Sequence, residues 1–324
     1  MRFYLLLLSL ALSVNAYSCD SRMKDYAFEC EYQDHFNKLK TDFKTYSISP
    51  LELKGYLLPF VLGDRDYYAK KNEYLNHSKE NLATNRQWIT WKNSQNITTK
   101  LNPIVLEITD VVRLQSNLLS TKSLGDIFNT KLGRLRTGNA EINPTITYSC
   151  EDEKINNDVI ALFNDYDLKT EEGYSLLTIK NIIACKDSKD KKSGQIVFYK
   201  NASVRSELNR WLVDFNDTLS RYDANETINV SPYEYLADMR RWFVAISPFL
   251  EGNESVAEAL MLYATNRLNL PPMGQPKQGT AILFSAEENR NQVMKRMKES
   301  LTFFEGCLFE TKTKFVSEEC RSLI

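Results

Sequence analysis

The chain has 324 residues, with 41 basic and 42 acidic side chains and a formal net charge of −1. A balanced charge produces no overall positive field, so we expect no nucleic-acid partner. Glycine and proline are scarce, with 11 and 9 residues, and apolar residues recur at three- and four-residue spacing over long stretches. The composition therefore predicts a mainly α-helical protein.

The first residues have the pattern of a secretory signal peptide. Arg2 precedes a run of mostly apolar residues from Phe3 to Leu12, and small residues lead to Ala16. The run is shorter than the roughly 20 residues needed to cross a bilayer, and no later stretch is apolar enough to span one. We therefore expect a signal peptide over 1–16, no transmembrane segment, and a secreted or periplasmic protein.

Six cysteines follow the expected cleavage point, and no Cys-x-x-Cys spacing occurs among them. An even number of cysteines in an oxidising compartment predicts disulfides, although six cysteines allow 15 connectivities. The two histidines, His35 and His77, are not placed beside a cysteine pair, so a zinc site is not expected. The simplest pairing joins sequence neighbours: Cys19 with Cys30, Cys150 with Cys185, and Cys307 with Cys320.

Three segments are distinguished in the first two thirds of the chain. Residues 17–95 are predicted to form an N-terminal helical extension, and a helix is expected over 101–119, where Gln115 interrupts the apolar stripe. From 139 to 200 the pattern changes. Residues 145–148 and 196–199 are β-branched or aromatic and are predicted strands, with a charged, solvated loop over 186–192 between them.

Helices return in the last third of the chain. A helix over 204–219 is predicted to bury one stripe, and Ser231 followed by Pro232 marks the start of a helix ending at Ile246. Further helices are expected over 253–267 and 287–304, the latter within a C-terminal extension at 276–324. The predicted stripe of the first helix consists of Leu208, Trp211, Leu212 and Phe215.

A short loop between two of these helices carries a recognisable motif. It reads Ser247-Pro248-Phe249-Leu250-Glu251-Gly252-Asn253-Glu254-Ser255. This resembles the signature of Fic domains, His-Pro-Phe-x-(Asp/Asn)-Gly-Asn-Gly-Arg-x-x-Arg, found in enzymes that transfer AMP or related groups to protein hydroxyls. Gly133 to Arg136 and Leu270 to Pro272 are similar to flanking Gly-x-x-Arg and Leu-Pro-Pro patterns of the family. The resemblance implies a Fic-like helical core over 96–275, with 139–200 as an enlarged β-hairpin flap.

Four positions depart from the family motif, and each departure bears on chemistry. Ser247 replaces the histidine that acts as the base, and a serine has no pKa near 7 with which to accept a proton. Ser255 and Glu258 replace the two arginines that hold phosphates, and Glu254 replaces a glycine. Pro248 and Phe249 keep the motif core, while Gly252 and Asn253, with Ser255, would form an anion-binding or ligand loop. We therefore expect no AMP transfer by the family's usual mechanism.

The substitutions also create an acidic cluster of Glu251, Glu254 and Glu258. Acids near a helix start interact favourably with its dipole, and we expect Asn253 to be the N-cap. Alternatively, the cluster binds a divalent cation through Glu251 or acts as an acid/base pair. No other cofactor is expected. The basic residues Arg136, Arg240 and Arg241 are predicted to lie at the surface or to face the flap.

The residues favour an exported, disulfide-linked pseudoenzyme that binds a protein partner through 139–200. One alternative is altered chemistry at Glu251 and Glu254, with group transfer from a metal-bound diphosphate donor. Another is cell-wall glycan cleavage, because Glu254-Ser255 resembles the Glu-Ser of lytic transglycosylases. An unrelated helical adhesin is the third alternative.

Overall fold

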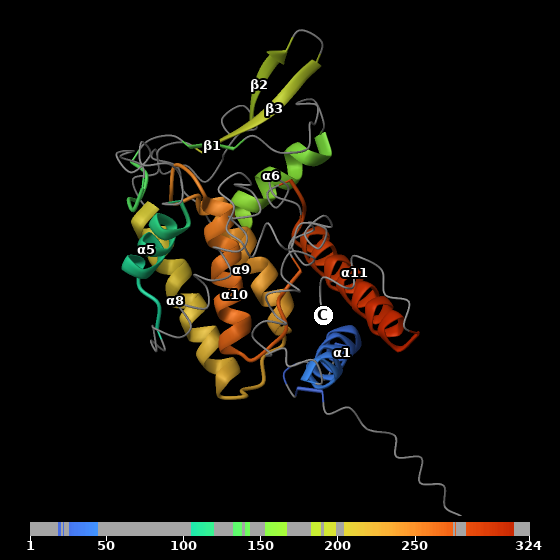
Figure 1. Ribbon diagram of the computed structural model, residues 1–324. Helices are drawn as coiled ribbons and strands as arrows, with labels where there is room; N and C mark the ends of the chain where they lie inside the picture. Colours follow the sequence, from blue (N-terminus) through green and yellow to red (C-terminus); the bar gives the residue numbers. More distant parts are fainter. Residues whose placement is uncertain are drawn as a thin grey trace, which may run out of the picture.

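The computed structural model describes residues 19–20, 22, 26–44, 105–119, 132–137, 140–142, 153–166, 183–188, 191–198, 204–274, 276 and 283–313. Helices dominate these residues, which confirms the predicted mainly α class (Figure 1). They are α1 (Ala27–Lys44), α5 (Ile108–Leu119), α6 (Glu153–Asp165), α8 (Val204–Asp223), α9 (Pro232–Ile246), α10 (Asn253–Arg267) and α11 (Ala286–Thr313). The expected signal peptide lies outside the described residues. Within those residues, no helix combines the length and apolarity needed to cross a membrane.

Helix α9 is the centre of the helical body, since it packs against α6, α8, α10 and α11 (Figure 1). Its bounds agree with the prediction from the sequence. The Ser231 hydroxyl accepts a hydrogen bond from the Glu234 amide at 3.0 Å, and Pro232 occupies the first turn, where its missing N–H is not needed. The helix ends at Ser247, a left-handed cap residue with φ of 44°, directly before Pro248.

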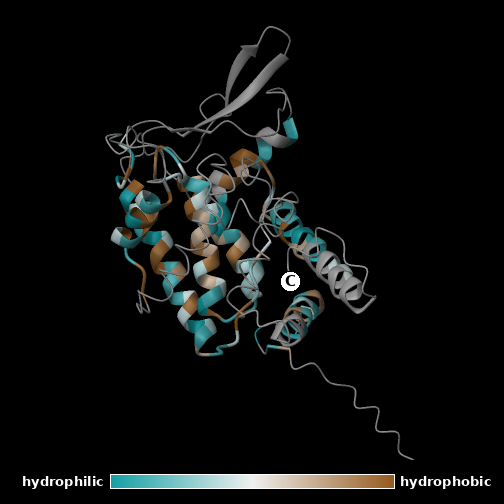
Figure 2. Cartoon of the chain, in the orientation of Figure 1, coloured by the Kyte–Doolittle hydropathy of each residue, from teal (hydrophilic) through white to brown (hydrophobic). Residues whose placement is uncertain are grey.

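The core is built on the predicted stripe of α8 and on almost the whole of α10. Leu208, Trp211, Leu212 and Phe215 are all buried, as expected. Trp211 stacks on Phe215 with ring centroids 4.5 Å apart, meets Phe243 edge-on, and donates its indole N–H to the Met239 carbonyl at 2.9 Å. Figure 2 shows apolar and polar residues side by side along α8 and α9, as is usual for helices with one buried face. The buried aromatic rings therefore join α8 to α9 beneath the motif loop.

Three helices differ in length from their predictions, and one of them, α8, extends to Asp223, four residues beyond the predicted end at 219. Helix α5 begins at Ile108 and not near residue 101, and α11 continues to Thr313, nine residues beyond the predicted end at 304. Helix α6 was not predicted; it lies within the segment 139–200, for which only strands and a loop were expected. This segment therefore contains helical as well as extended structure.

The described strands form a three-stranded antiparallel sheet with the order β1-β3-β2. They are β1 (Ala140–Ile142), β2 (Ile183–Ser188) and β3 (Lys191–Phe198). Strand β3 includes most of the predicted strand over 196–199, while the predicted strand over 145–148 lies outside the described residues. The loop expected over 186–192 is wrong at both ends, because Lys186 to Ser188 pair with Lys191 to Ser193 in the register of a hairpin.

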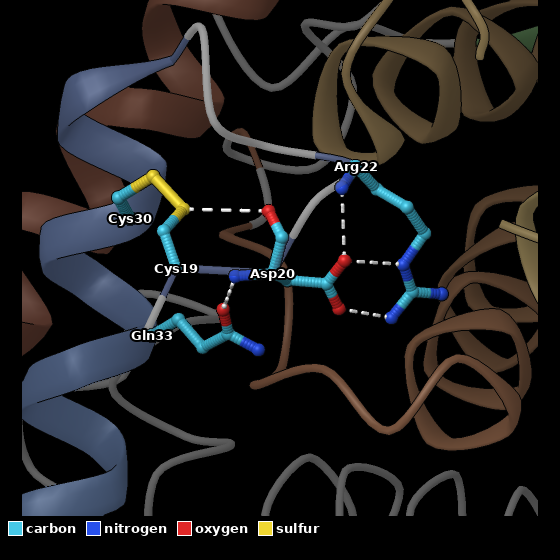
Figure 3. The surroundings of a disulfide bond; sticks show 5 residues. All are labelled: Cys19, Asp20, Arg22, Cys30 and Gln33. Atoms are coloured by element: carbon cyan, nitrogen blue, oxygen red, sulfur yellow. Dashed lines mark hydrogen bonds and ion pairs between the residues drawn. A yellow bond between two sulfur atoms is a disulfide. The ribbon is translucent and has the colours of Figure 1, made fainter. Parts of the chain in front are cut away.

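The N-terminal helix α1 is linked to the chain before it by a disulfide. Cys19 and Cys30 are bonded, with their Cα atoms 5.1 Å apart, which confirms this pairing (Figure 3). Beside the disulfide, Arg22 forms an ion pair with Asp20 and donates to the Leu268 carbonyl at 2.9 Å. The side chains of the other four cysteines lie outside the described residues. The N-terminal segment is therefore held against the end of α10.

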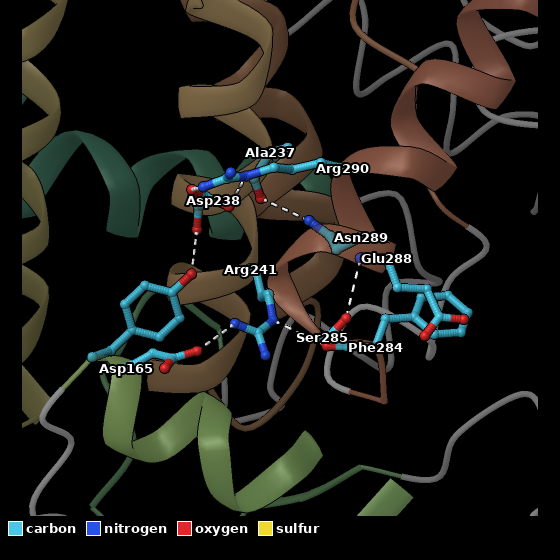
Figure 4. A network of polar contacts seen from close by, with 10 residues as sticks. Asp165, Ala237, Asp238, Arg241, Phe284, Ser285, Glu288, Asn289 and Arg290 are labelled. Atoms are coloured by element: carbon cyan, nitrogen blue, oxygen red, sulfur yellow. Dashed lines mark hydrogen bonds and ion pairs between the residues drawn. The ribbon is translucent and has the colours of Figure 1, made fainter. Parts of the chain in front are cut away.

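A polar network around Arg241 ties α6 and α11 to α9 (Figure 4). The Arg241 guanidinium donates to Asp165 at 3.1 Å and to the Phe284 carbonyl at 3.2 Å. From α11, Asn289 donates to the Ala237 carbonyl at 3.1 Å, and Arg290 forms an ion pair with Asp238. These contacts hold α6 and α11 against α9, the helix that leads into the motif loop.

Candidate functional site

The motif loop joins the end of α9 to the start of α10, and Ser247 is its first residue. The Ser247 side chain is completely buried, and its hydroxyl donates to the Val244 carbonyl at 2.6 Å. Its backbone N–H donates to the Phe243 carbonyl at 3.1 Å, completing the helix cap. The Ser247 hydroxyl, which the motif resemblance aligns with the Fic histidine, is thus directed at the helix backbone.

Asn253 closes the loop by bonding back across it. Its side-chain oxygen accepts from the Phe249 amide at 2.9 Å, and its side-chain nitrogen donates to the Phe249 carbonyl at 2.8 Å. Phe249 is fully buried, as expected for the motif core. The expectation that Asn253 is the N-cap is wrong: Gly252 occupies that position with φ of 79°, a conformation that glycine adopts readily. Asn253 therefore shapes the loop, and the start of α10 has no side-chain cap.

The segment 133–136 lies against the motif loop and is hydrogen-bonded to it. The Arg136 amide donates to the Pro248 carbonyl at 2.9 Å, and its guanidinium donates to the carbonyls of Ser247 at 2.6 Å and Ile246 at 3.2 Å. Burial lowers the pKa of Arg136 to about 10, so it remains charged at neutral pH. Charge-assisted bonds to carbonyls are stronger than neutral ones. Arg136 therefore holds the end of α9 and the start of the loop together.

Gln115, on α5, bonds to both the segment 133–136 and the motif loop. Its side-chain oxygen accepts from the Gly133 amide at 2.7 Å, and its side-chain nitrogen donates to the Glu251 carbonyl at 3.3 Å. The residue is fully buried. Its position as the polar interruption of an apolar stripe was the available signal, because a buried amide requires partners. The sequence did not reveal which backbone groups those partners are.

The three basic residues expected at the surface or facing the flap are instead buried. Arg136 is 6% exposed, and Arg240 and Arg241 are 0% exposed. Each is buried beside backbone carbonyls or a carboxylate, which compensates part of the desolvation of its charge. The prediction that these arginines lie at the surface or face the flap is therefore wrong. It was based on charge alone, and a charged side chain can be buried where carbonyls or a carboxylate lie beside it.

The predicted acidic cluster is divided between the loop surface and the core. Glu258 is 4% exposed and lies 3.8 Å from the Arg240 guanidinium. Glu251 and Glu254 are half-buried beside Ser255. Among the described residues, no group of three or more His, Cys, Asp or Glu side chains is arranged to hold a metal ion. Glu258 therefore does not act as a surface acid next to Glu254, and its charge is opposed inside the protein.

Arg240 itself is an unusual buried cation. Its three guanidinium nitrogens have no hydrogen-bond partner within the described part of the chain, and Glu258 is its acidic neighbour on α10. The motif resemblance aligns position 258 with the second arginine of the Fic signature, but in this chain the positive charge lies on α9 and the negative charge on α10. The sequence contained both residues, but their juxtaposition depends on how α9 and α10 pack.

No known protein-family model matches the chain, and no curated protein shows significant sequence similarity to it. The likeness to Fic domains therefore depends on the quoted motif and its flanking patterns.

Proposed function

We propose that the chain is an exported protein-binding module on a Fic-like scaffold that does not transfer AMP by the family's usual mechanism. The observation that carries this proposal is the environment of Ser247. Its buried hydroxyl donates to Val244, and a serine cannot act as a base near neutral pH. A target hydroxyl placed at this loop would find no group at that position to take its proton.

The charges around the start of α10 also support the proposal. The uncapped amides there would attract an anion, but Glu254 lies in the first turn and Ser255 supplies no positive charge. Replacing attraction by repulsion changes the energy by about 1–4 kcal/mol for each charge pair at roughly 4 Å. Glu258 contributes less than its sequence position suggests, because Arg240 opposes it. Weak nucleotide binding follows mainly from Glu254 and from the missing arginines.

The partner surface in this proposal is the segment 139–200. Strand β3 lies in the middle of the described sheet, so β1 and β2 are its outer strands. An outer strand has backbone groups on one side that can pair with an extended segment of another protein. The hairpin of β2 and β3 would then be the counterpart of the Fic flap and would bind a partner without catalysis.

Nucleotide binding tests the first part of the proposal. Calorimetry with ATP, CDP-choline and UDP-sugars, each with Mg²⁺ or Mn²⁺, is expected to give no saturable heat for the wild-type chain. The matched variant S247H/E254G/S255R restores three motif positions and is expected to bind ATP measurably. Saturable binding by the wild type, with labelled product formed from an acceptor protein, would contradict the proposal and favour the metal-bound diphosphate donor.

Partner binding tests the second part. Proteins that crosslink to the intact chain in its native extracellular setting are compared with those captured by a chain lacking 150–185. Loss of these partners, with a helical circular dichroism signal reduced only by the contribution of α6, which the deletion removes, is the expected result. Retention of every partner by the shortened chain would show that the partner surface is elsewhere.

Hydrolysis of purified cell-wall glycan that is abolished by Glu254→Gln would replace the proposal with the glycan-cleaving alternative.

A further inference from the structure

A separate cavity lies between the first turns of α5 and α8 and the segment 133–137. Its volume is about 620 Å³, which falls within the range of roughly 300–1,000 Å³ for small-ligand sites. None of the residues that line it belongs to the motif loop. The lining residues are Ile108, Thr109, Val112, Gly133, Arg134, Leu135, Arg136, Thr137, Val204 and Arg205.

The lining combines aliphatic side chains with two accessible cations. Ile108, Val112 and Leu135 are only half-buried, so part of their apolar surface is open to a ligand. Arg134 and Arg205 are exposed, and within the described part of the chain neither forms an ion pair. An apolar surface beside two unpaired guanidinium groups is suited to a molecule with both an apolar part and a negative charge.

Acidic residues lie near the starts of α5 and α8, and each has a partner there: the Glu107 carboxylate accepts from the Thr109 hydroxyl at 3.4 Å. The Asp110 carboxylate accepts from the Glu107 amide at 3.0 Å at the start of α5, and Glu207 pairs with Arg210 at 2.6 Å in the first turns of α8. Neither carboxylate forms an ion pair with Arg134 or Arg205 within the described part of the chain. Both helices also begin at the cavity, where Asp110 and Glu207 in their first turns offset part of the positive ends of their dipoles.

Arg136 has a different role from the other two arginines. Its guanidinium is directed away from solvent to the Ser247 and Ile246 carbonyls. It therefore forms a wall of the cavity and leaves Arg134 and Arg205 as the groups that can reach a ligand.

We propose that this cavity binds a small organic anion with an apolar body, such as a carboxylate on an aliphatic frame. The aliphatic side chains pack against the body, and Arg134 and Arg205 bind the carboxylate through charge-assisted hydrogen bonds. Its lining shares the segment 133–136 with the support of the motif loop, but the groups that bind the anion, Arg134 and Arg205, lie outside that loop.

Decanoate is the probe that tests the site, with decanol as the uncharged molecule of the same chain length. Calorimetry at low and high salt is expected to show one saturable decanoate site that weakens as salt rises, because salt screens exposed charges. Decanol is expected to bind at least about tenfold more weakly, since it lacks the charge that two guanidinium groups recognise. Equal binding of the two molecules, or no saturable decanoate binding, would overturn the proposal.

Variants locate the site. R134Q/R205Q is expected to weaken decanoate binding about tenfold or more, and Val112→Glu to abolish it by placing a carboxylate in the cavity. The control is Arg113→Gln, which removes a positive charge from an exposed position on the same helix outside the lining, and it should leave the affinity within about twofold. Each variant must retain the wild-type circular dichroism spectrum. Unchanged affinity in folded R134Q/R205Q, or an equal loss in Arg113→Gln, would refute the assignment.

Discussion

The two ends of α9 each carry a fully buried serine, but the two serines have different neighbours. At the start, Ser231 caps the helix and donates its hydroxyl to Glu29 of α1, a buried carboxyl group. At the end, Ser247 donates to Val244, and its carbonyl accepts from Arg136. The start of α9 is therefore held partly through an ionisable group, whereas the end is held through backbone groups and one cation.

This difference predicts where the protein is sensitive to pH. Burial raises the pKa of Glu29 to about 8, and its second carboxyl oxygen has no hydrogen-bond partner among the described residues. At the motif loop, the groups that hold the backbone do not titrate near neutral pH. The docking of α1 is thus the pH-dependent contact, and the loop geometry is maintained across the same range.

The largest expected effect lies between the two ends, at the buried pair Arg240 and Glu258. Glu258→Leu leaves the Arg240 guanidinium buried without its acidic neighbour, and removing one partner of a buried pair is expected to lower the free energy of unfolding by about 3–5 kcal/mol. The double variant R240M/E258L should recover most of that loss, because neither charge of this pair then remains buried. Urea unfolding of the three proteins measures both values.

A surface pair serves as the control for this prediction. Arg221 and Glu226 are 3.0 Å apart with both side chains about half exposed, so Arg221→Met should change stability by less than about 1 kcal/mol. If Glu258→Leu were as mild as Arg221→Met, the pair would not be a buried ionic contact as described.

The second prediction concerns pH. The folded-state pKa of Glu29, about 8, lies above its ordinary value of 4.5. At a pH between these two values, Glu29 is protonated in the folded protein and ionised in the unfolded chain. The free energy of unfolding therefore falls as pH rises from about 4.5 to 8, by up to about 1.4 kcal/mol for each pH unit. Glu29→Gln should remove this slope, which is measured by urea unfolding at several pH values.

Glu31→Gln is the matched control, since Glu31 is exposed on the same helix. It should keep the wild-type slope. An identical pH dependence in the wild type and Glu29→Gln would show that Glu29 is not the responsible group.

The sequence was sufficient for features that depend on local pattern. Ser231 with Pro232 marked the start of α9, and the buried face of α8 followed from residue spacing. Contacts between distant elements could not be predicted, because they depend on how helices pack. Arg240 was expected outside the core for this reason, and Glu258 was assigned to an acidic cluster with Glu251 and Glu254, although it lies against Arg240.

The smallest expected effect tests the other end of α9. Gln115→Met keeps a similar volume but removes the acceptor for the Gly133 amide and the donor for the Glu251 carbonyl. Leaving such groups unsatisfied is expected to lower stability by about 1–3 kcal/mol, with no dependence on pH from 5 to 8.

Hydrogen exchange should show faster exchange at Gly133 and over 247–253, while the core amides of α8 change only with global stability. Arg113→Met, at an exposed position on α5, should leave these rates unchanged. The difference in free energy of unfolding between the wild type and Gln115→Met should therefore be the same at every pH, because Gln115 contributes only neutral hydrogen bonds to the loop. A difference that changed with pH as steeply as the contribution of Glu29 would contradict the distinction between the two ends of α9.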